Sequence, residues 1–532
     1  MRLLYRTTLE KIISLHIIGR TTYMSNLKHT FTSGKISDTT IYIGFLIFVL
    51  SLPYDNLTLF LNIGMSLVLI GWVGRIIYER KLGWHRTPLD IPIVLFLALA
   101  LVASLFAPNP SAVISIGYLW KLLRAILLFY AVIHCRLGNR WRHVLIAFFV
   151  SAGISSMLGI WYYTNDTGLA HALMGQVGLE YQNELATDEG FSDGFRADLR
   201  TINIPLSQTA SIEQTKKSDE WQINDSDRNR RYFVKNDETH LNVYMIEQRL
   251  AGTFKAPNYL GAYLALSLPF VLGFFVASWH SLRKLKYGTW VIFALSAIVI
   301  MMAANLVLTL TRGAWVGVAV AILCIGLYLV VVSLSKMKSL GDVLKCGLIG
   351  AILLSMILGA YVHLTPQHIK TRFNTLVERP TGFMGERPQW WGISLDLIKK
   401  HPIIGVGMGR FRHEAQLNSP PDVQDIPFHA HNIYLHIAVE QGIPSLLLFL
   451  WMVGLFWKQI WAIRSNTDSE GDFWRIGAFI GGSGFLISTL VYGTADYIFH
   501  HRTLLLFWFI IGIIYYIQIY KDEIDEKRLE TD

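Results

Sequence analysis

The sequence contains little charge and few cysteines. Of its 532 residues only 16% are charged, 52% are hydrophobic, and the mean hydropathy is +0.39. Soluble domains carry about 25% charged residues, so this composition excludes an ordinary soluble enzyme. The three cysteines, Cys135, Cys324 and Cys346, lie in or beside apolar runs, which argues against a disulfide framework and a cysteine-based metal site.

Long apolar runs recur along the chain. Runs of about 18–22 residues are long enough to cross the hydrocarbon core of a bilayer as helices. The twelve runs expected to do so are 40–54, 58–76, 90–106, 112–134, 143–163, 258–278, 289–310, 314–334, 343–363, 442–460, 474–491 and 503–520. The sequence therefore predicts an all-α polytopic membrane protein with about twelve transmembrane helices, because open sheets cannot span lipid.

Positive charge is concentrated in alternate connections between these runs. The net charge is +9, but Lys and Arg follow every second run, whereas the connections 55–57 and 107–111 contain none. This positive-inside pattern places both termini in the cytoplasm and the segments 164–257, 364–441 and 492–502 on the outer side. It indicates membrane lipids, and no nucleic acid, as partners of the basic residues.

The runs and connections divide the chain into seven segments. These are a leader (1–39), spans 1–5 (40–163), a polar insertion (164–248), spans 6–9 (249–363), a second outer loop (364–441), spans 10–12 (442–520) and a tail (521–532). The large outer loops are expected to form a cap on the bundle. In the leader, Met24 is a candidate start of the chain, and an interfacial amphipathic helix around Ile12–Ile18 is the alternative.

The two large outer loops differ in how much secondary structure their sequences predict. The insertion is polar and has no helical period, but alternation at 231–234 and 241–244 predicts a short hairpin. It is interpreted as a loosely ordered surface insertion, with an acceptor-binding or lid element as the alternative. In the second loop an amphipathic helix is expected to open near Arg387 and to end before Pro402.

Two arginines are candidates for binding phosphate at the outer membrane surface. Arg312 lies in a very short outer connection beside a glycine, and Arg249 lies just before the sixth span. Arginine binds phosphate well because its planar guanidinium donates two hydrogen bonds. Together they are expected to clamp a diphosphate, although an arginine at a helix end can also simply snorkel to water.

Two further cations, Lys121 and Arg124, lie inside the fourth span and three residues apart, so they share one helix face. Charges at that depth usually face a cavity or a partner. The sequence leaves two alternatives open: they bind a lipid phosphate, or they pair with an acid elsewhere in the bundle.

His431 is the candidate general base. A neutral imidazole accepts a proton near pH 7, and a nearby carboxylate raises its basicity. Asn432 is a natural helix N-cap, which leaves His431 available. His429, His500 and His501 are weaker candidates. No His-x-x-x-His pair lies in the outer loops, so no metal and no cofactor are expected, and Gly405-x-Gly407-x-Gly409 is interpreted as a turn.

The order and membrane side of these motifs resemble the O-antigen ligase and polymerase superfamily of bacterial membrane glycosyltransferases. The matching elements are Arg249-Leu-Ala-Gly-Thr-Phe with Pro257-Asn258, Thr311-Arg312-Gly313-Ala314-Trp315, Arg387 to Trp391 with His401-Pro402-Ile403-Ile404-Gly405-Val406-Gly407, and His431-Asn432-x-Tyr434-Leu435 with Glu440-x-Gly442-Ile443. The long insertion 164–248 departs from a compact ligase and leaves the acceptor open.

The resemblance implies a function at the periplasmic face of the bacterial inner membrane. Such enzymes transfer a glycan from an undecaprenyl diphosphate carrier to an acceptor hydroxyl. The positions of the matching motifs imply that His431 activates the acceptor and that Arg249 and Arg312 hold the diphosphate. Further candidates for substrate binding are Arg387, Asn432 and Glu440. The expected reaction is metal-independent and inverts the anomeric centre.

Several readings of the function stay open at this point. Ligases and repeat-unit polymerases use the same donor, and lipid A core, a growing glycan and a protein serine are all conceivable acceptors. A twelve-span transporter is the alternative from another class. No two-half repeat, midplane acidic pair or matched broken helices support it.

Overall fold

A computed structural model of the chain is organised around a bundle of long helices. It describes residues 36–80, 85–106, 112–135, 137–165, 180–184, 211–214, 220–225, 230–237, 240–247, 249–283, 285–336, 387–419, 426–465 and 473–529. The predicted span 343–363, the candidate start Met24 and most of the leader lie outside these residues. So do 364–386 and 420–425 of the second outer loop.

Eleven of the twelve predicted spans coincide with helices in the described part of the chain. Nine of these are long and apolar enough to cross a membrane, and Ile36–Ser51 and Asp90–Leu105 are shorter. The bundle helices after the first are α2 (Thr58–Glu79), α3 (Asp90–Leu105), α4 (Ala112–His134), α5 (Arg140–Asn165), α8 (Pro257–Ser281), α9 (Gly288–Leu308), α10 (Arg312–Lys336), α16 (Ile433–Ser465), α17 (Phe473–Gly493) and α18 (His501–Leu529). The expectation of a polytopic helical membrane protein is therefore confirmed in its main feature.

Helices α8, α17 and α18 form the centre of the bundle, and α9 and α10 lie at its outside. The closest approach is between α8 and α17. An added Cβ on Gly273 would lie 2.1 Å from the backbone nitrogen of Gly481, so these two backbones touch. Small residues commonly allow such contact between membrane helices, because helix association in lipid depends on close packing.

The insertion contains a sheet, and here the all-α expectation is wrong. Its strands are β1 (Glu180–Glu184), β2 (Ser211–Gln214), β3 (Glu220–Asp225), β4 (Arg230–Asp237) and β5 (His240–Glu247), and they pair antiparallel in the order β1-β5-β4-β3-β2. The predicted hairpin is present as β4 and β5, with Val234 opposite Val243. The other strands are short and polar and gave no clear period in the sequence.

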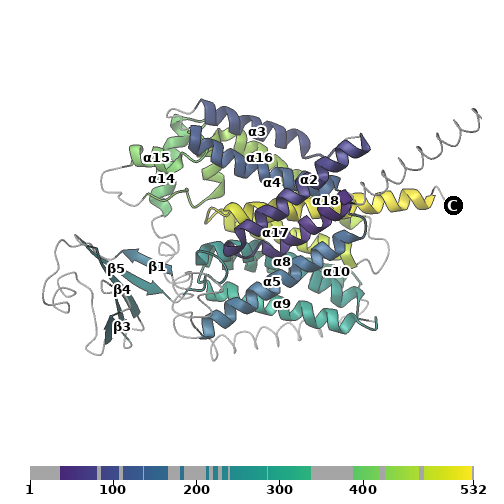
Figure 1. Cartoon of the computed structure of the whole chain (residues 1–532), viewed down its shortest axis with the longest axis horizontal. Coiled ribbons are helices and arrows are strands. Elements are labelled where there is room, and N and C mark those ends of the chain that lie inside the picture. Colours follow the sequence, from purple (N-terminus) through teal and green to yellow (C-terminus); the bar gives the residue numbers. More distant parts are fainter. Residues whose placement is uncertain are drawn as a thin grey trace, which may run out of the picture.

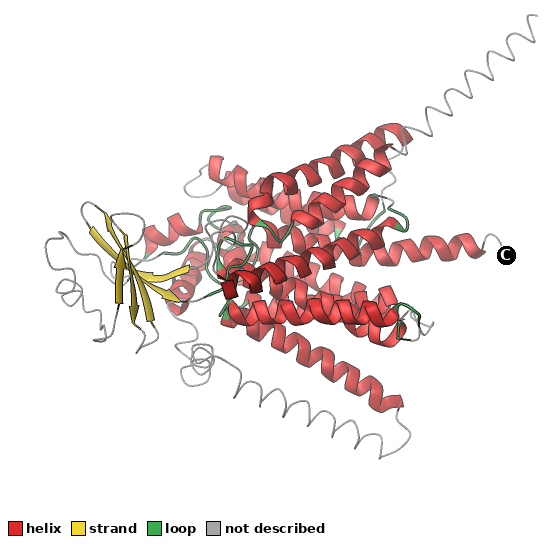
Figure 2. Ribbon diagram, turned by 60° about the horizontal axis from the view of Figure 1, so that its bottom comes forward, coloured by secondary structure: helices red, strands yellow, loops and turns green. Residues whose placement is uncertain are grey.

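The sheet stands off one end of the bundle (Figures 1 and 2), on the same side as α14 (Arg387–Lys400) and α15 (Phe411–Asn418) (Figure 1). The C-terminus of α18 lies at the opposite end (Figure 1). The segments expected on one side of a membrane thus gather at one end, which we call the His431 end.

Candidate active site

The first turn of α16 is capped by the residue that follows His431. The side-chain oxygen of Asn432 accepts hydrogen bonds from the backbone N–H groups of Tyr434 (2.9 Å) and Leu435 (3.0 Å), and its amide donates to the carbonyl of Thr494 (3.1 Å). Asn432 is therefore the N-cap that the sequence predicted, and its side chain also fixes the α17–α18 loop. His431 itself has a left-handed backbone with φ of +46°.

The ring of His431 meets a carboxylate from the loop between α17 and α18. Its Nδ1 atom lies 2.7 Å from Oδ1 of Asp496, whose side chain is only 3% exposed. The backbone N–H of Tyr497 also donates to Oδ1 (2.8 Å), and the hydroxyl of Tyr492 donates to Oδ2 (3.2 Å). A guanidinium nitrogen of Arg387 lies 3.9 Å from Oδ2. The carboxylate is thus held from several sides and aimed at one imidazole nitrogen.

These neighbours keep Asp496 ionised. Burial by itself raises the pKa of this carboxyl, but His431, Arg387 and His429 outweigh it and hold the pKa well below its usual 3.8. Charged and hydrogen-bonding partners favour the carboxylate over the acid. Arg387, expected to bind substrate, therefore has a second role here, because it helps to keep Asp496 charged.

Helix α14 forms the wall on the other side of His431. The indole of Trp390 stacks on the His431 ring, with 5.0 Å between the ring centroids and 29° between the planes. Trp391 donates from its indole nitrogen to the carbonyl of Ala430 (3.1 Å). Together these contacts fix both the backbone before His431 and the plane of its ring.

The two candidate phosphate-binding arginines lie in neighbouring segments. Arg249 is buried, and its guanidinium donates to the carbonyl of Thr309 (3.0 Å), to Asn258 Oδ1 (2.7 Å) and to Thr311 Oγ1 (3.3 Å). Thr311 directly precedes Arg312, which is half-buried at the start of α10. The structure thus brings the two segments together and fixes Arg249 in a network of hydrogen bonds.

Gly313, the residue after Arg312, packs against the segment that carries Asp496. A Cβ on Gly313 would lie 2.9 Å from the ring of Tyr492 and 3.2 Å from Cβ of Ala495. Tyr492 and Ala495 belong to the helix end and loop that carry Asp496. The glycine is required for this close approach, which places the start of α10 against the loop of Asp496.

The glycine-rich stretch after α14 is a turn, as predicted, and its partner is α16. Gly405, Gly407 and Gly409 all have positive φ (75°, 98° and 70°). The N–H groups of Val406 and Gly407 donate to the carbonyls of Val439 and Glu440. Those carbonyls are available because α16 has a non-helical residue at Gly442.

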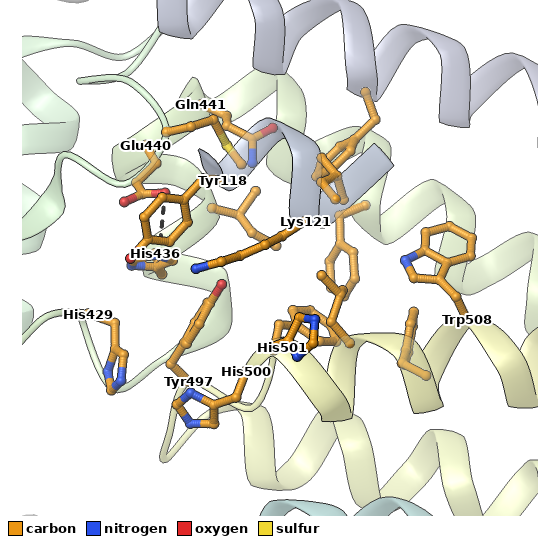
Figure 3. Close-up of a pocket in the computed structure, with 18 of the residues that line it drawn as sticks. Tyr118, Lys121, His429, His436, Glu440, Gln441, Tyr497, His500, His501 and Trp508 are labelled. Atoms are coloured by element: carbon orange, nitrogen blue, oxygen red, sulfur yellow. Dashed lines mark ion pairs between the residues drawn. The ribbon is translucent and has the colours of Figure 1, made fainter. Parts of the chain in front are cut away.

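Glu440 stabilises the same turn with its side chain. The buried carboxylate accepts hydrogen bonds from the backbone N–H groups of Gly409, Arg410 and Phe411, the last at 3.3 Å. Its other oxygen lies 3.4 Å from Nε2 of His436 (Figure 3). Glu440 was expected to bind substrate, and the structure places it as an anchor at the edge of a cavity.

This cavity has a volume of about 360 Å³ and lies between α3, α4, α16 and α18. Its polar lining consists of Tyr118, Lys121, Tyr259, His429, His436, Glu440, Gln441, Tyr497, His500 and His501, and its aromatic lining includes Phe96, Phe449, Phe499, Phe507 and Trp508. His429 joins the cavity to the Asp496 site, because its ring centroid lies 4.6 Å from that of His431. The polar groups gather on one side of the cavity and Trp508 lies on the other (Figure 3).

The two cations expected on one face of the fourth span point to different neighbours. Lys121 extends into the cavity, with its ammonium 4.4 Å from the ring centroid of Tyr118 (Figure 3). Arg124 instead donates to Asn62 Oδ1 on α2 (2.9 Å). The structure therefore separates the pair, with Lys121 toward the cavity and Arg124 toward a polar amide.

Two of the cavity histidines are held in the neutral form. Burial and the neighbouring His431 hold the pKa of His429 well below 6.5. Burial likewise lowers the pKa of His500 to about 4. The cavity therefore presents uncharged imidazoles at neutral pH.

Asp496 was not among the residues predicted to have a role. It is the only acidic residue in the predicted outer connection 492–502, and that was the available signal. What could not be read from the sequence is that this loop folds back onto the residue before α16. The same folding brings His429, His431 and Asp496 together, with ligand atoms all within 4.8 Å of one another, so that this trio could hold a metal ion.

Part of the chain is similar to a known protein family. Residues 297–450 match the O-antigen ligase family. The match includes Arg312, Arg387, His431, Asn432 and Glu440, while Arg249, Lys121, Arg124 and Asp496 lie outside it. No curated protein matches the chain. The matched part, which carries the motifs from Arg312 to Glu440, is therefore similar to the O-antigen ligase family.

Proposed function

We propose that this protein transfers a glycan from undecaprenyl diphosphate to an acceptor hydroxyl at the periplasmic face of the bacterial inner membrane. The observation that carries the proposal is the buried carboxylate of Asp496 at 2.7 Å from Nδ1 of His431. A base oriented by a carboxylate is what activation of a hydroxyl requires. The family match and the apolar helices support a membrane glycosyltransferase.

His431 is the general base in this reaction. Ionised Asp496 accepts a hydrogen bond from the Nδ1–H group, so the Nε2 lone pair is left for the acceptor hydroxyl. As the proton of that hydroxyl moves to Nε2, the acceptor oxygen bonds to the anomeric carbon and the bond from this carbon to the diphosphate oxygen breaks. Asp496 stabilises the resulting imidazolium, as the carboxylate does in a catalytic triad.

Arg312, held in place with the help of Arg249, neutralises the charge that develops on the leaving diphosphate. Guanidinium groups fixed at that position stabilise the transition state without reorganisation. Arg312 is the group in direct contact with the diphosphate. Arg249 positions the segment Thr309–Thr311, because three of its hydrogen bonds end there or on Asn258.

Direct displacement by the hydroxyl inverts the anomeric centre, and no step in it uses a metal ion. The diphosphate leaves as an anion and needs charge neutralisation more than protonation. This chemistry fits the two arginines and one base described above.

The cavity is the site at which the lipid-linked part of a substrate meets the catalytic groups. It has aromatic and polar walls, and Lys121 places a cation inside it. An isoprenoid chain suits the aromatic wall and a phosphate suits the ammonium. In this arrangement the His431 end faces the periplasm and both termini lie in the cytoplasm.

A repeat-unit polymerase, or a protein O-oligosaccharyltransferase of the same superfamily, would use the same donor and base. Only the acceptor differs: lipid A core for a ligase, a growing glycan for a polymerase, and a protein serine for the third. The strands β1–β5 stand at the His431 end (Figure 2), where an acceptor would approach.

The proposal is tested with purified protein in lipid nanodiscs. An undecaprenyl diphosphate-linked glycan is supplied with candidate acceptors, and the released undecaprenyl diphosphate and the anomeric configuration of the product are measured. We expect release that depends on acceptor, persists in EDTA and gives an inverted linkage. Retention of configuration, or loss of activity in EDTA that added metal restores, would contradict the mechanism.

A further inference from the structure

Three metal-ligand side chains meet at the site. Ligand atoms of His429, His431 and Asp496 all lie within 4.8 Å of one another. Within the described part of the chain, Nδ1 of His429 is buried and has no hydrogen-bond partner. A buried polar atom without a partner is costly and calls for an explanation.

We propose that His429, His431 and Asp496 form a binding site for a divalent transition-metal ion of the Zn²⁺ type, and that the bound ion inhibits the enzyme. Binding is independent of the proposed function, whereas inhibition rests on His431 being the base. The ion is here an inhibitory ligand and no participant in transfer.

The donor set suits this class of ion. Two imidazoles and one carboxylate favour Zn²⁺, Cu²⁺, Ni²⁺ and Co²⁺ over Ca²⁺ or Mg²⁺, which prefer oxygen ligands. Ligand atoms around a tetrahedral Zn²⁺ lie about 3.3 Å apart, as follows from bond lengths of about 2.0–2.1 Å. The 2.7 Å pair of His431 and Asp496 would open slightly, and the wider separations, all within 4.8 Å, would close. A further imidazole lies beside the trio, since the ring centroid of His500 is 5.4 Å from that of His429.

Inhibition follows from the tautomer of His431. Without metal, the Nδ1 proton is donated to Asp496 and Nε2 carries the lone pair. An ion bound to Nδ1 takes the place of that proton, and the neutral ring then carries its single proton on Nε2. A ring in this form donates at Nε2 and cannot accept the proton of an acceptor hydroxyl.

The test uses the full-length protein in nanodiscs, with Co²⁺ as a spectroscopic probe and Zn²⁺ as a competitor. We expect visible absorption bands of four- or five-coordinate Co²⁺, at one ion per chain, that Zn²⁺ displaces. His429→Gln should abolish these bands. His401→Gln is the matched control, since it removes a histidine at the same end of the bundle outside the trio, and it should bind Co²⁺ as the wild type does.

Transfer is measured in parallel, each variant relative to its own metal-free rate. At Zn²⁺ ten times above the measured dissociation constant, the wild-type and His401→Gln rates should fall about tenfold, because binding follows simple mass action, and EDTA should restore them. Absence of the bands in the wild type, or their persistence in His429→Gln, would overturn the site. Full binding without inhibition would overturn the inhibitory effect and, with it, the role of His431 as base.

Discussion

Nδ1 of His431 lies 2.7 Å from Oδ1 of Asp496, a residue 65 positions later in the chain. The two sit at the ends of different helices, α16 and α17, so the contact exists only when these helices pack in register. The proposed chemistry depends on this pair, and most of the predictions below address it or the elements that hold it.

Asp496→Asn should lower transfer about 10³-fold or more. An amide can donate to Nδ1 and so favour the wrong tautomer, as at the equivalent carboxylate of a catalytic triad, where about 10⁴ is lost. The initial rate of undecaprenyl diphosphate release measures this. Tyr492→Phe is the matched control, because it removes only one of the hydrogen bonds to Asp496 and should cost less than tenfold. Activity of Asp496→Asn within threefold of wild type would exclude the orienting role.

The two arginines should respond differently to substitution. Arg312→Ala should lower kcat/KM about 10²-fold, the size found for the loss of one charge-stabilising donor, with little change in the thermal unfolding midpoint. Arg249→Ala should also destabilise the fold by about 1–3 kcal/mol, because buried Thr309 and half-buried Asn258 lose their hydrogen bonds. Rates and unfolding midpoints of both variants separate the two effects. A fully stable Arg249→Ala variant would contradict the positioning role.

The break in α16 should be intolerant of a side chain. Gly442 has φ of +81°, and a Cβ there would lie 2.0 Å from the carbonyl oxygen of Ile403. We expect Gly442→Ala to cost about 1–3 kcal/mol, as strained backbone does, and to loosen the turn 405–409. Gly454→Ala on the same helix is the control, since no atom lies within 4 Å of its added Cβ. Equal unfolding midpoints for the two variants would show that the break is not under this constraint.

The buried neutral histidines should make the protein less stable in mild acid. The pKa of His500 is lowered to about 4 in the folded state from 6.5, so the unfolded chain binds more protons between these values. Stability is therefore full above pH 6.5 and falls as the pH drops toward 4. The pKa of Asp496 is shifted downward, below 3.8, so this residue stays ionised and causes no loss of stability between pH 6.5 and 4. Unfolding midpoints from pH 7.5 to 5 should fall less in His500→Gln than in wild type, and parallel curves would contradict this.

Hydropathy and charge were sufficient to predict the bundle, because the bilayer imposes length and apolarity on each span. The cap at Asn432 could be predicted from a local rule, since an N-cap needs only the residues that follow it. The grouping of the candidate residues at one end also followed from the order of the spans.

The partners of those residues could not be predicted, because they come from packing between distant segments. Asp496 reaches His431 only through the α16–α17 contact. The carboxylate of Glu440 accepts hydrogen bonds from a turn that lies about thirty residues earlier in the chain. Strands β1–β3 are short and polar, so they carry too few alternating apolar residues to be recognised. Lys121 and Arg124 share a helix face in the sequence but point to different neighbours in the bundle.

The central claim is that His431 drives glycan transfer from a lipid carrier. The most direct test compares cells lacking the gene with cells carrying either wild-type protein or His431→Ala at equal membrane levels, with the carrier-linked glycan pool measured in each. We predict that glycan accumulates on undecaprenyl diphosphate in the deletion, that wild type clears it, and that His431→Ala does not. Clearance by His431→Ala equal to wild type, or an unchanged pool in the deletion, would contradict the account.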